Sequence, residues 1–390
     1  MKKRFILFAV LILLMMCNCM ALAQEATDIT AECTITVSDR SRITRLIDRD
    51  YSTSMVTDRA KKIRIEITTP ENQPATSLYL CFGKIPEHWS IEHEMDGEWV
   101  EAVQGDTNYL HAYAEFDAST HFRIVVSYGY ADKLNLKELF VFSQGDCPDW
   151  VQRWEPTHEK ADLLLLVAHP DDELIFFGGL IPTYAVQRNM NVVVAYMTAA
   201  STVRNSELLN GLWSMGVRNY PVVGPFGDGY STSLSNGYEK WSKNKARKFV
   251  MGLLRQYKPD IMLTHDVAGE YGHGAHRVCA DVAQYCAENS DNASICPDSA
   301  EQYGTWPLKK LYLHLYGDQP MRMDWNISLS SQNGRTGLEA AQQAYLHHVS
   351  QQGTEYVVTD EGETSSALFG LAYSLVGDDV LANDFFENIT

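Results

Sequence analysis

Hydrophobic and polar positions follow two different periods along the chain. In the first part, short runs alternate apolar and polar residues between turn-forming residues; they lie at 33–37, 63–67, 78–80, 89–91, 122–126 and 139–141. A period of two with frequent turns is typical of strands that have one buried face. No long helical pattern interrupts these runs. We therefore expect residues 28–146 to form an all-β domain, an antiparallel β-sandwich.

After residue 158, wholly apolar runs alternate with stretches of helical period. The apolar runs predict buried strands at 163–168, 192–197, 220–223, 261–264 and 311–315, and helices are predicted at 172–188, 204–215, 246–257 and 277–287. This alternation favours a Rossmann-like α/β domain with a mainly parallel sheet. Pro148 and Pro156 mark a linker at 147–158, which leaves 159–390 for the second domain. No GxGxxG sequence follows the first strand, so a dinucleotide is not implied.

Polar residues gather where the first apolar run ends, in His169-Pro170-Asp171-Asp172-Glu173. Open α/β sheets bind their ligands at this end of their strands. His169 and Asp172 lie three apart across the strand-to-helix turn, so both can face one point, and an imidazole with a carboxylate suits zinc. Asp171 is then free to act as a base. Helix capping by the carboxylates is the alternative interpretation.

A second polar loop follows the run 261–264 and leads into another helical stretch. It contains His273 and His276, separated by two residues. One histidine of this loop, with His169 and Asp172, would complete a three-ligand zinc site with an open position, the form of hydrolytic zinc sites. An isolated HxxH pair is more often a pair of surface or capping histidines, so this prediction depends on both clusters being present.

The first 23 residues resemble an export signal. A basic start, Lys2-Lys3-Arg4, precedes an apolar run at 5–16 and Ala21-Leu22-Ala23. We predict cleavage near Ala23, a secreted or cell-surface protein, and no membrane insertion after signal removal. Two methionines precede Cys17, which is a poor context for a lipoprotein anchor.

Charge and cysteines restrict the partners and the compartment. Removing the signal takes away three of the 32 basic residues and none of the 50 acidic ones, which leaves a net charge of 29 − 50 = −21. Such an acidic chain is a poor partner for nucleic acid. Export allows disulfides, and Cys33–Cys147 and Cys286–Cys296 are the two candidate pairs, although sequence does not fix their connectivity.

Four motifs occur in order between residues 155 and 390: Ala168-His-Pro-Asp-Asp-Glu173, Arg204-x-x-Glu207, Met215-Gly-Val217 and Gly269-Glu-Tyr-Gly-His-x-x-His276. Together they resemble the PIG-L/LmbE family of zinc-dependent N-acetylglucosamine deacetylases. By that resemblance, His169, Asp172 and His276 hold Zn²⁺, and Asp171 is the general base that activates the metal-bound water. His273 and Tyr271 would assist catalysis at the oxyanion or the leaving amine. Arg204 would contact the sugar, with a surface ion pair to Glu207 as the alternative.

This sequence departs from the family between its two histidines, where Gly274-Ala275 replaces the usual Pro-Asp. If that aspartate orients the first histidine, its role here is vacant. Glu270, Asp266 or another carboxylate would have to take it, or catalysis would be weaker.

The first domain resembles discoidin-like (galactose-binding-like) jelly rolls. The resemblance lies in an early loop at 46–53, a hairpin at 95–99 and a last strand at 136–142. Such modules often bind glycans through loop aromatics, but a domain that only packs against an enzyme is equally compatible with the sequence. We expect Trp89 and Trp99 to be sandwich core.

The sequence thus predicts an exported, zinc-dependent hydrolase that removes the N-acetyl group from an N-acetylglucosamine-type sugar in an extracellular or cell-surface glycan. Trp213, Tyr230 and Tyr238 are candidates for a sugar-stacking rim, or alternatively core aromatics. One rival is a catalytically weak or inactive glycan-binding protein that uses its β-sandwich. A second is a zinc hydrolase of the same fold acting on another amide or ester. A phosphoryl-transfer enzyme is a distant third, because no phosphate-cradling loop is present.

Overall fold

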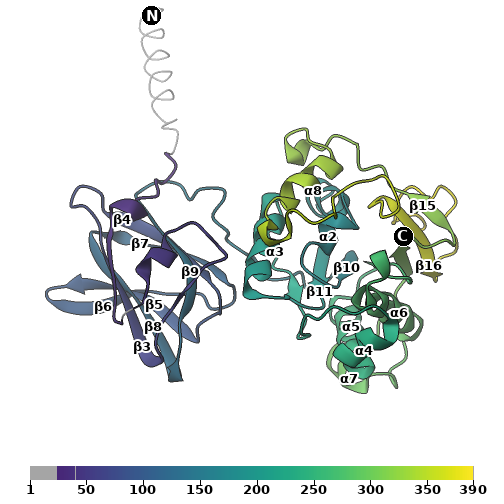
Figure 1. Cartoon of the computed structure of the whole chain (residues 1–390), viewed down its shortest axis with the longest axis horizontal. Helices are drawn as coiled ribbons and strands as arrows, with labels where there is room; N and C mark the ends of the chain where they lie inside the picture. Colours follow the sequence, from purple (N-terminus) through teal and green to yellow (C-terminus); the bar gives the residue numbers. More distant parts are fainter. Residues whose placement is uncertain (1–23, 40, 390) are drawn as a thin grey trace, which may run out of the picture. The chain divides into compact units, whose positions relative to one another are not determined.

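The chain divides into two compact units, Met1–Arg153 and Trp154–Thr390. The computed structural model describes residues 24–39 and 41–389, so the predicted signal peptide lies outside the described residues. Figure 1 colours the first unit purple to blue and the second teal to yellow. Within the described residues, no helix has the length and apolar character that crossing a membrane requires.

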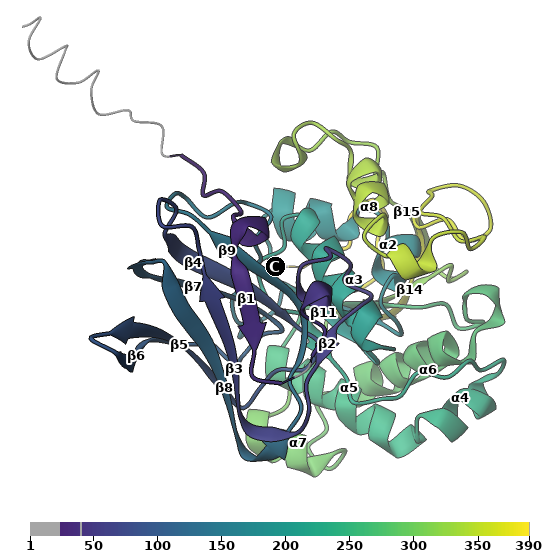
Figure 2. The same ribbon diagram turned by 60° about the vertical axis from the view of Figure 1, so that its left-hand side comes forward.

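The N-terminal unit is the predicted sandwich of two antiparallel sheets (Figure 2). A five-stranded sheet has the order β1-β3-β8-β5-β6, and a four-stranded sheet has the order β2-β9-β4-β7. The only helices of the described part of this unit are two short 3₁₀ turns, η1 and η2. The bounds are η1 Thr30–Glu32, β1 Thr34–Val37, η2 Ile43–Leu46, β2 Met55–Val56, β3 Ala60–Thr68, β4 Ala75–Phe82, β5 His88–Met95, β6 Glu98–Gln104, β7 His111–Ser119, β8 His121–Asp132 and β9 Asn135–Phe142.

Alternating burial along the strands builds the sandwich core. In β3, Ile63, Ile65 and Ile67 are buried while the residues between them are more exposed, as a period of two requires. The expectation for the two tryptophans was half right. Trp89 is buried, whereas Trp99 lies outside the core, with the Arg123 guanidinium 4.1 Å above its ring.

The C-terminal unit is built on a seven-stranded sheet with the order β12-β11-β10-β13-β14-β16-β15. The strands from β12 to β14 are parallel, and β16 and β15 add antiparallel pairs, so the mainly parallel α/β prediction is confirmed. The strand bounds are β10 Leu163–Val167, β11 Val192–Tyr196, β12 Val222–Val223, β13 Ile261–Thr264, β14 Lys310–His314, β15 Pro320–Arg322 and β16 Leu368–Ser374. The helix bounds are α2 Asp172–Ile175, η3 Ile181–Gln187, α3 Thr202–Ser214, α4 Leu234–Lys240, α5 Lys243–Tyr257, η4 Glu270–Gly272, α6 Gly274–Asn289, α7 Pro297–Tyr303, η5 Ser330–Gln332, α8 Gly337–Tyr345 and η6 Val349–Gln351.

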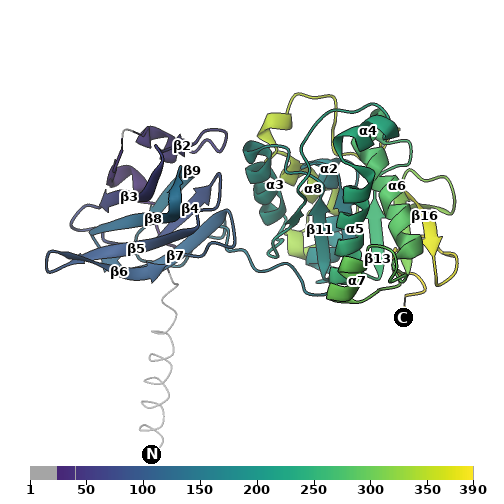
Figure 3. The same cartoon turned by 90° about the horizontal axis from the view of Figure 1, so that it is seen from below.

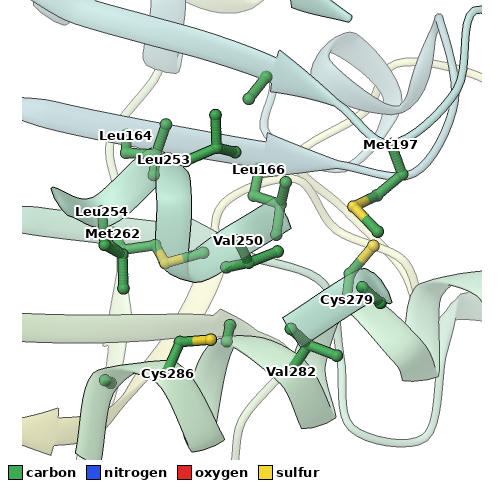
Figure 4. Packing of buried hydrophobic residues seen from close by; sticks show 14 of the residues in the cluster. Leu164, Leu166, Met197, Val250, Leu253, Leu254, Met262, Cys279, Val282 and Cys286 are labelled. Carbon is green, nitrogen blue, oxygen red and sulfur yellow. The ribbon is translucent and has the colours of Figure 1, made fainter. Parts of the chain in front are cut away.

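Two helices cover one face of this sheet and bury its main core. Figure 3 shows α5 and α6 beside each other, and both contribute to one cluster of buried residues with β10, β11, β13 and β14. In Figure 4, Leu164 and Leu166 of β10 lie with Val250 and Leu254 of α5 and Val282 of α6. The helices α2, α3 and α8 form a separate group, with α8 in contact with both others. Hydrophobic burial on both faces explains why the central strands read as unbroken apolar runs.

The predicted continuous helix over 172–188 is wrong in its middle. The α-helix α2 ends at Ile175, and a π-helix, η3, begins at Ile181. Gly178 between them has φ +48°, and a Cβ there would lie 2.4 Å from the Ser366 hydroxyl oxygen. Close packing against a distant segment therefore interrupts a stretch whose apolar period is helical.

The two predicted disulfides are also wrong, because the six cysteines of the described residues are all free thiols. The thiol of Cys33 donates to the backbone carbonyl of Ile29 at 3.2 Å instead of pairing with Cys147. Cys286 is buried on α6 and points at the backbone carbonyl of Arg247, on α5, rather than at Cys296. An even number of cysteines permits such pairs but does not fix them.

Candidate metal centre

The two polar clusters predicted from the sequence meet at one edge of the sheet. Strand β10 pairs in parallel with β13, so the loops that follow them leave from the same edge. The first loop contains His169 and leads into α2, and the second contains His273 and leads into α6. The carboxyl ends of adjacent parallel strands are where such sheets place their ligands.

The three predicted metal ligands come together in the buried interior of this edge. One ligand atom each from His169, Asp172 and His276 lie within 4.8 Å of one another. His169 Nδ1 is 3.2 Å from Asp172 Oδ2, and His276 Nε2 is 3.5 Å from Asp172 Oδ1. His276 Nε2 is buried and has no hydrogen-bond partner among the described residues. An orphaned imidazole nitrogen facing a carboxylate and a second imidazole fits a divalent metal.

Glu270 fixes the orientation of His276 and of two further histidines. Its carboxylate accepts hydrogen bonds from Nδ1 of His265 at 2.9 Å, His276 at 2.8 Å and His314 at 2.7 Å. Because Nδ1 of His276 donates to this carboxylate, its Nε2 lone pair is left for a metal. Burial alone would raise the pKa of Glu270, but the imidazoles, with His265 foremost, hold it well below its usual range.

A second grouping, His265, Glu270 and His276, also has metal-ligand geometry. Both ring nitrogens of His265 are already engaged, however. Its Nδ1 donates to Glu270, and its Nε2 accepts the backbone N–H of Ala168 at 3.0 Å. Since no lone pair of His265 is left for a cation, this trio orients His276, and the site of His169, Asp172 and His276 is the metal candidate.

Asp171 occupies a strained position beside the ligands. Its φ of +105° is rare for a side chain with a Cβ, and its backbone N–H donates to Glu173 Oε2 at 2.9 Å. Burial and the neighbouring Asp172 charge raise the pKa of Asp171 well above its usual range, against the opposing charge of Arg204. A carboxylate made more basic in this way is suited to accept a proton.

Arg204 pairs with the predicted base rather than with Glu207. Its Nη2 donates to Asp171 Oδ1 at 2.6 Å and to the backbone carbonyl of Pro170. Glu207 instead accepts from the backbone N–H and hydroxyl of Ser350, at 2.6 and 2.7 Å. The alternative of a surface pair between Arg204 and Glu207 is therefore not what the fold adopts.

His273 is the residue affected by the alanine at position 275. His273 is the N-cap residue of α6, and its Nδ1 accepts a hydrogen bond from the backbone N–H of Ala275 at 3.1 Å. The Ala275 methyl group is buried in the main core. Burial, with the nearby His276 and His169, lowers the pKa of His273 to about 3. The ring is therefore neutral with its proton on Nε2, which makes it a hydrogen-bond donor without help from a carboxylate.

A pocket opens over the candidate metal site. Six of the seven predicted site residues line it, all but His276. Four further lining residues were missed by the prediction from sequence: Asp228, Gln351, Thr354 and Tyr356. Asp228 Oδ1 lies 3.7 Å from His169 Nε2. Asp228 follows the short strand β12, and a polar residue beyond a strand end was the signal that could have found it.

The predicted aromatic rim is only partly present. Tyr230 lines the pocket and is 67% exposed. Trp213 is buried away from the pocket, where the Arg218 guanidinium lies 3.8 Å above its ring. The Tyr238 hydroxyl donates to Asp281 on α6. The latter two are therefore packing residues, as their alternative interpretation held.

Comparison with known proteins places this site in a family. Residues 164–287 match the family model described as PIG-L: GlcNAc-PI de-N-acetylase. Two curated relatives are 1D-myo-inositol 2-acetamido-2-deoxy-alpha-D-glucopyranoside deacetylases. The Frankia alni protein is 26% identical over 174 residues, 37% of this chain and 59% of that protein. The Mycolicibacterium smegmatis protein is 26% identical over 147 residues, 31% of this chain and 51% of that protein. The chain thus spans less than two thirds of the length of these relatives.

Among solved structures, the N,N'-diacetylchitobiose deacetylase from Pyrococcus horikoshii is 19% identical, over 51% of this chain and 74% of that chain, with a TM-score of 0.37. The family 32 CBM from C. perfringens NanJ is 16% identical, over 30% of this chain and 99% of that chain, with a TM-score of 0.26. The matched residues 164–287 include His169, Asp172 and His276 and the strands β11, β12 and β13. This part of the C-terminal unit therefore matches the PIG-L family, and the two curated relatives are N-deacetylases.

Proposed function

We propose that this protein is a metal-dependent hydrolase that removes the N-acetyl group from an N-acetylglucosamine-type amino sugar. The observation that carries the proposal is the buried trio of His169, Asp172 and His276, in which an orphaned imidazole nitrogen lies 3.5 Å from the Asp172 carboxylate. The basic carboxylate of Asp171 is next to Asp172 in the chain. His169, Asp171 and Asp172 line an open pocket together with other polar residues and tyrosines.

We propose Zn²⁺ as the metal. Two imidazoles and one carboxylate are the donor set of catalytic zinc sites that keep an open position. When bound, such an ion lowers the pKa of a coordinated water and polarises a carbonyl oxygen. Glu270 supports the assignment, because a carboxylate on the far nitrogen of a ligating histidine raises its basicity and fixes its tautomer.

The residues around the ligands divide the proton chemistry between them. Asp171 accepts a proton from the attacking water, and Arg204 holds its carboxylate in place. The water oxygen forms a bond to the acetamide carbon, and the carbon–nitrogen bond then breaks to give acetate and the free amine. The amine needs one proton to leave, and Asp171 can return the one it took. The neutral His273 directs its Nε2–H to the developing oxyanion.

We further propose that the protein acts outside the cytoplasm, on an extracellular or cell-surface glycan. The basic and apolar pattern of residues 1–23 supports export. An added β-sandwich unit is consistent with a polymeric substrate, although packing alone would also account for it. Fractionating the producing cells and sequencing the N-terminus of the mature protein tests this proposal, with a start at Gln24 as the expected result.

The activity is tested by acetate release from the zinc-loaded protein. The substrates are N-acetylglucosamine, N,N'-diacetylchitobiose, and N-acetylated cell-wall and mucin-type glycans, each also incubated with Asp171→Asn. Release by the wild type alone supports the deacetylase. If zinc is bound but no substrate yields acetate, the function moves to another acyl substrate or to an inactive glycan-binding protein. Calorimetric binding of the same glycans, with an acylated amide and ester panel, separates those two outcomes.

A further inference from the structure

Three tyrosines line the pocket over the metal ligands. Tyr271 lies over the ligands, its ring centroid 5.3 Å from that of His276. Tyr356 packs against Tyr271 in a tilted arrangement, with ring centroids 4.6 Å apart and an interplanar angle of 35°, and the Tyr230 ring centroid lies 5.1 Å from that of His273. All three line the pocket, and Tyr230 and Tyr271 are 67% and 43% exposed. The aromatic surface thus continues from the ligands to solvent.

The positions of these aromatic rings are set by the backbone of two loops. Tyr271 has φ +46°, a conformation that costs free energy for a residue with a Cβ, in a loop fixed by the buried Glu270. Tyr356 comes from the segment after η6, which is tied to α3 through Ser350 and Glu207. Two segments that are distant in the sequence therefore place the Tyr271 and Tyr356 rings next to each other. Exposed aromatic rings placed in this way suit a ligand with apolar faces and polar edges.

We infer that the Tyr271–Tyr356 pair is a second subsite, which binds the sugar unit next to the one that carries the acetamide. The inference rests on the proposed function and names its substrate class: a disaccharide or longer glycan, not a free monosaccharide. An acetamide placed at the metal ligands leaves the rest of its own sugar within the polar pocket, between Asp228 and Arg204. The neighbouring sugar then contacts the Tyr271–Tyr356 pair, and its C–H face packs on an aromatic face.

The test compares N-acetylglucosamine with N,N'-diacetylchitobiose and N,N',N''-triacetylchitotriose on the zinc-loaded full protein. For the wild type, kcat/KM is expected to be higher for the two oligosaccharides than for the monosaccharide. Tyr356→Ala should lower kcat/KM for the oligosaccharides about three- to tenfold more than for the monosaccharide, chiefly through KM, because a ring–face contact contributes to binding rather than to chemistry. Tyr356→Phe should retain the wild-type preference.

Val357→Ala is the matched control, because Val357 is the exposed neighbour of Tyr356 and lies outside the pocket lining. It should leave both substrates unchanged. An equal loss of the monosaccharide and oligosaccharide rates in Tyr356→Ala, or no loss in either, overturns the subsite. If the wild type deacetylates none of these sugars, the proposed function fails, and calorimetric binding still decides the subsite. Binding of chitotriose that weakens in Tyr356→Ala supports it, and binding that is absent or unchanged overturns it.

Discussion

Each unit of this protein buries a histidine completely, and the two histidines are in opposite electrostatic situations. In the N-terminal unit, Nδ1 of His111 on β7 is hydrogen-bonded to the Tyr79 hydroxyl at 2.5 Å and contacts the Cys81 thiol at 3.7 Å. Burial, with the nearby Lys137 charge, lowers the pKa of His111 to about 3. In the C-terminal unit, burial would lower the pKa of His276, but Asp172 and Glu270 raise it to about 10.

The difference shows what separates a packed histidine from a ligand. Both rings have a buried Nε2 without a hydrogen-bond partner among the described residues. Only His276 has a carboxylate fixing its other nitrogen and a second carboxylate 3.5 Å from the orphaned one. Negative charge concentrated around an imidazole is costly unless a cation shares it, whereas a neutral ring beside a tyrosine needs no ion. The carboxylates, not the burial, identify the metal site.

Removing the Asp172 carboxylate should have the largest effect on the metal site. Asp172→Ala should abolish zinc retention and acetate release together, because Asp172 lies between the two histidine ligands. Zinc content after dialysis, measured by atomic absorption, checks this. His111→Phe in the other unit is the control and should keep its zinc. Stoichiometric zinc in Asp172→Ala would mean that the ligand trio is misassigned.

Changing the base separates chemistry from metal binding. Asp171→Asn is nearly isosteric and leaves the three ligands in place, so zinc should remain bound while kcat falls by about 10²–10⁴-fold, the usual contribution of a general base. The readout is zinc content beside the rate of acetate release. An active Asp171→Asn protein would contradict the proposed proton transfer, whatever its metal content.

Removing the second carboxylate should have a smaller effect. Glu270→Gln keeps the shape of the side chain but loses the charge that holds three imidazoles, so zinc affinity should fall by about 10- to 100-fold. Competition with a chromophoric chelator measures the affinity. Glu239→Gln, on the exposed helix α4, is the matched control. Unchanged affinity in Glu270→Gln would show that His276 needs no such partner.

The sequence alone predicted the sheet and the ligands for a physical reason. A buried parallel strand must be apolar throughout, so the polar residues at its end stand out, as in the run from Leu163 to His169. The helix over 172–188 was mispredicted, because its break is caused by packing of Gly178 against Ser366, nearly 200 residues away, which a local period cannot show.

The supporting residues were harder to predict than the ligands. His265 and His314 are single histidines at or near the ends of strands, without a motif, and their role appears only when Glu270 is placed between them. The sequence showed that Ala275 stands where the family has an aspartate, but it did not show what orients His273 instead. A backbone N–H orients His273, and backbone donors have no sequence signature.

The smallest expected effect concerns His111, whose titration should affect only the stability of its own unit. Its pKa is about 3 in the folded protein and about 6.5 when exposed, so its neutral form is the one that folding favours. The stability that this ring contributes is fully present above pH 6.5 and is lost as the pH falls towards 3, at up to about 1.4 kcal/mol per pH unit.

Hydrogen exchange of the β4 and β7 amides between pH 7 and 4.5 should therefore show a steeper loss of protection in the wild type than in His111→Phe. At pH 7 the variant itself should be less stable by about 1 kcal/mol, because it removes the buried hydrogen bond between His111 and the Tyr79 hydroxyl. Equal slopes in the two proteins would mean that His111 takes up its proton as readily in the fold as in the unfolded chain, and that the contrast with His276 does not hold.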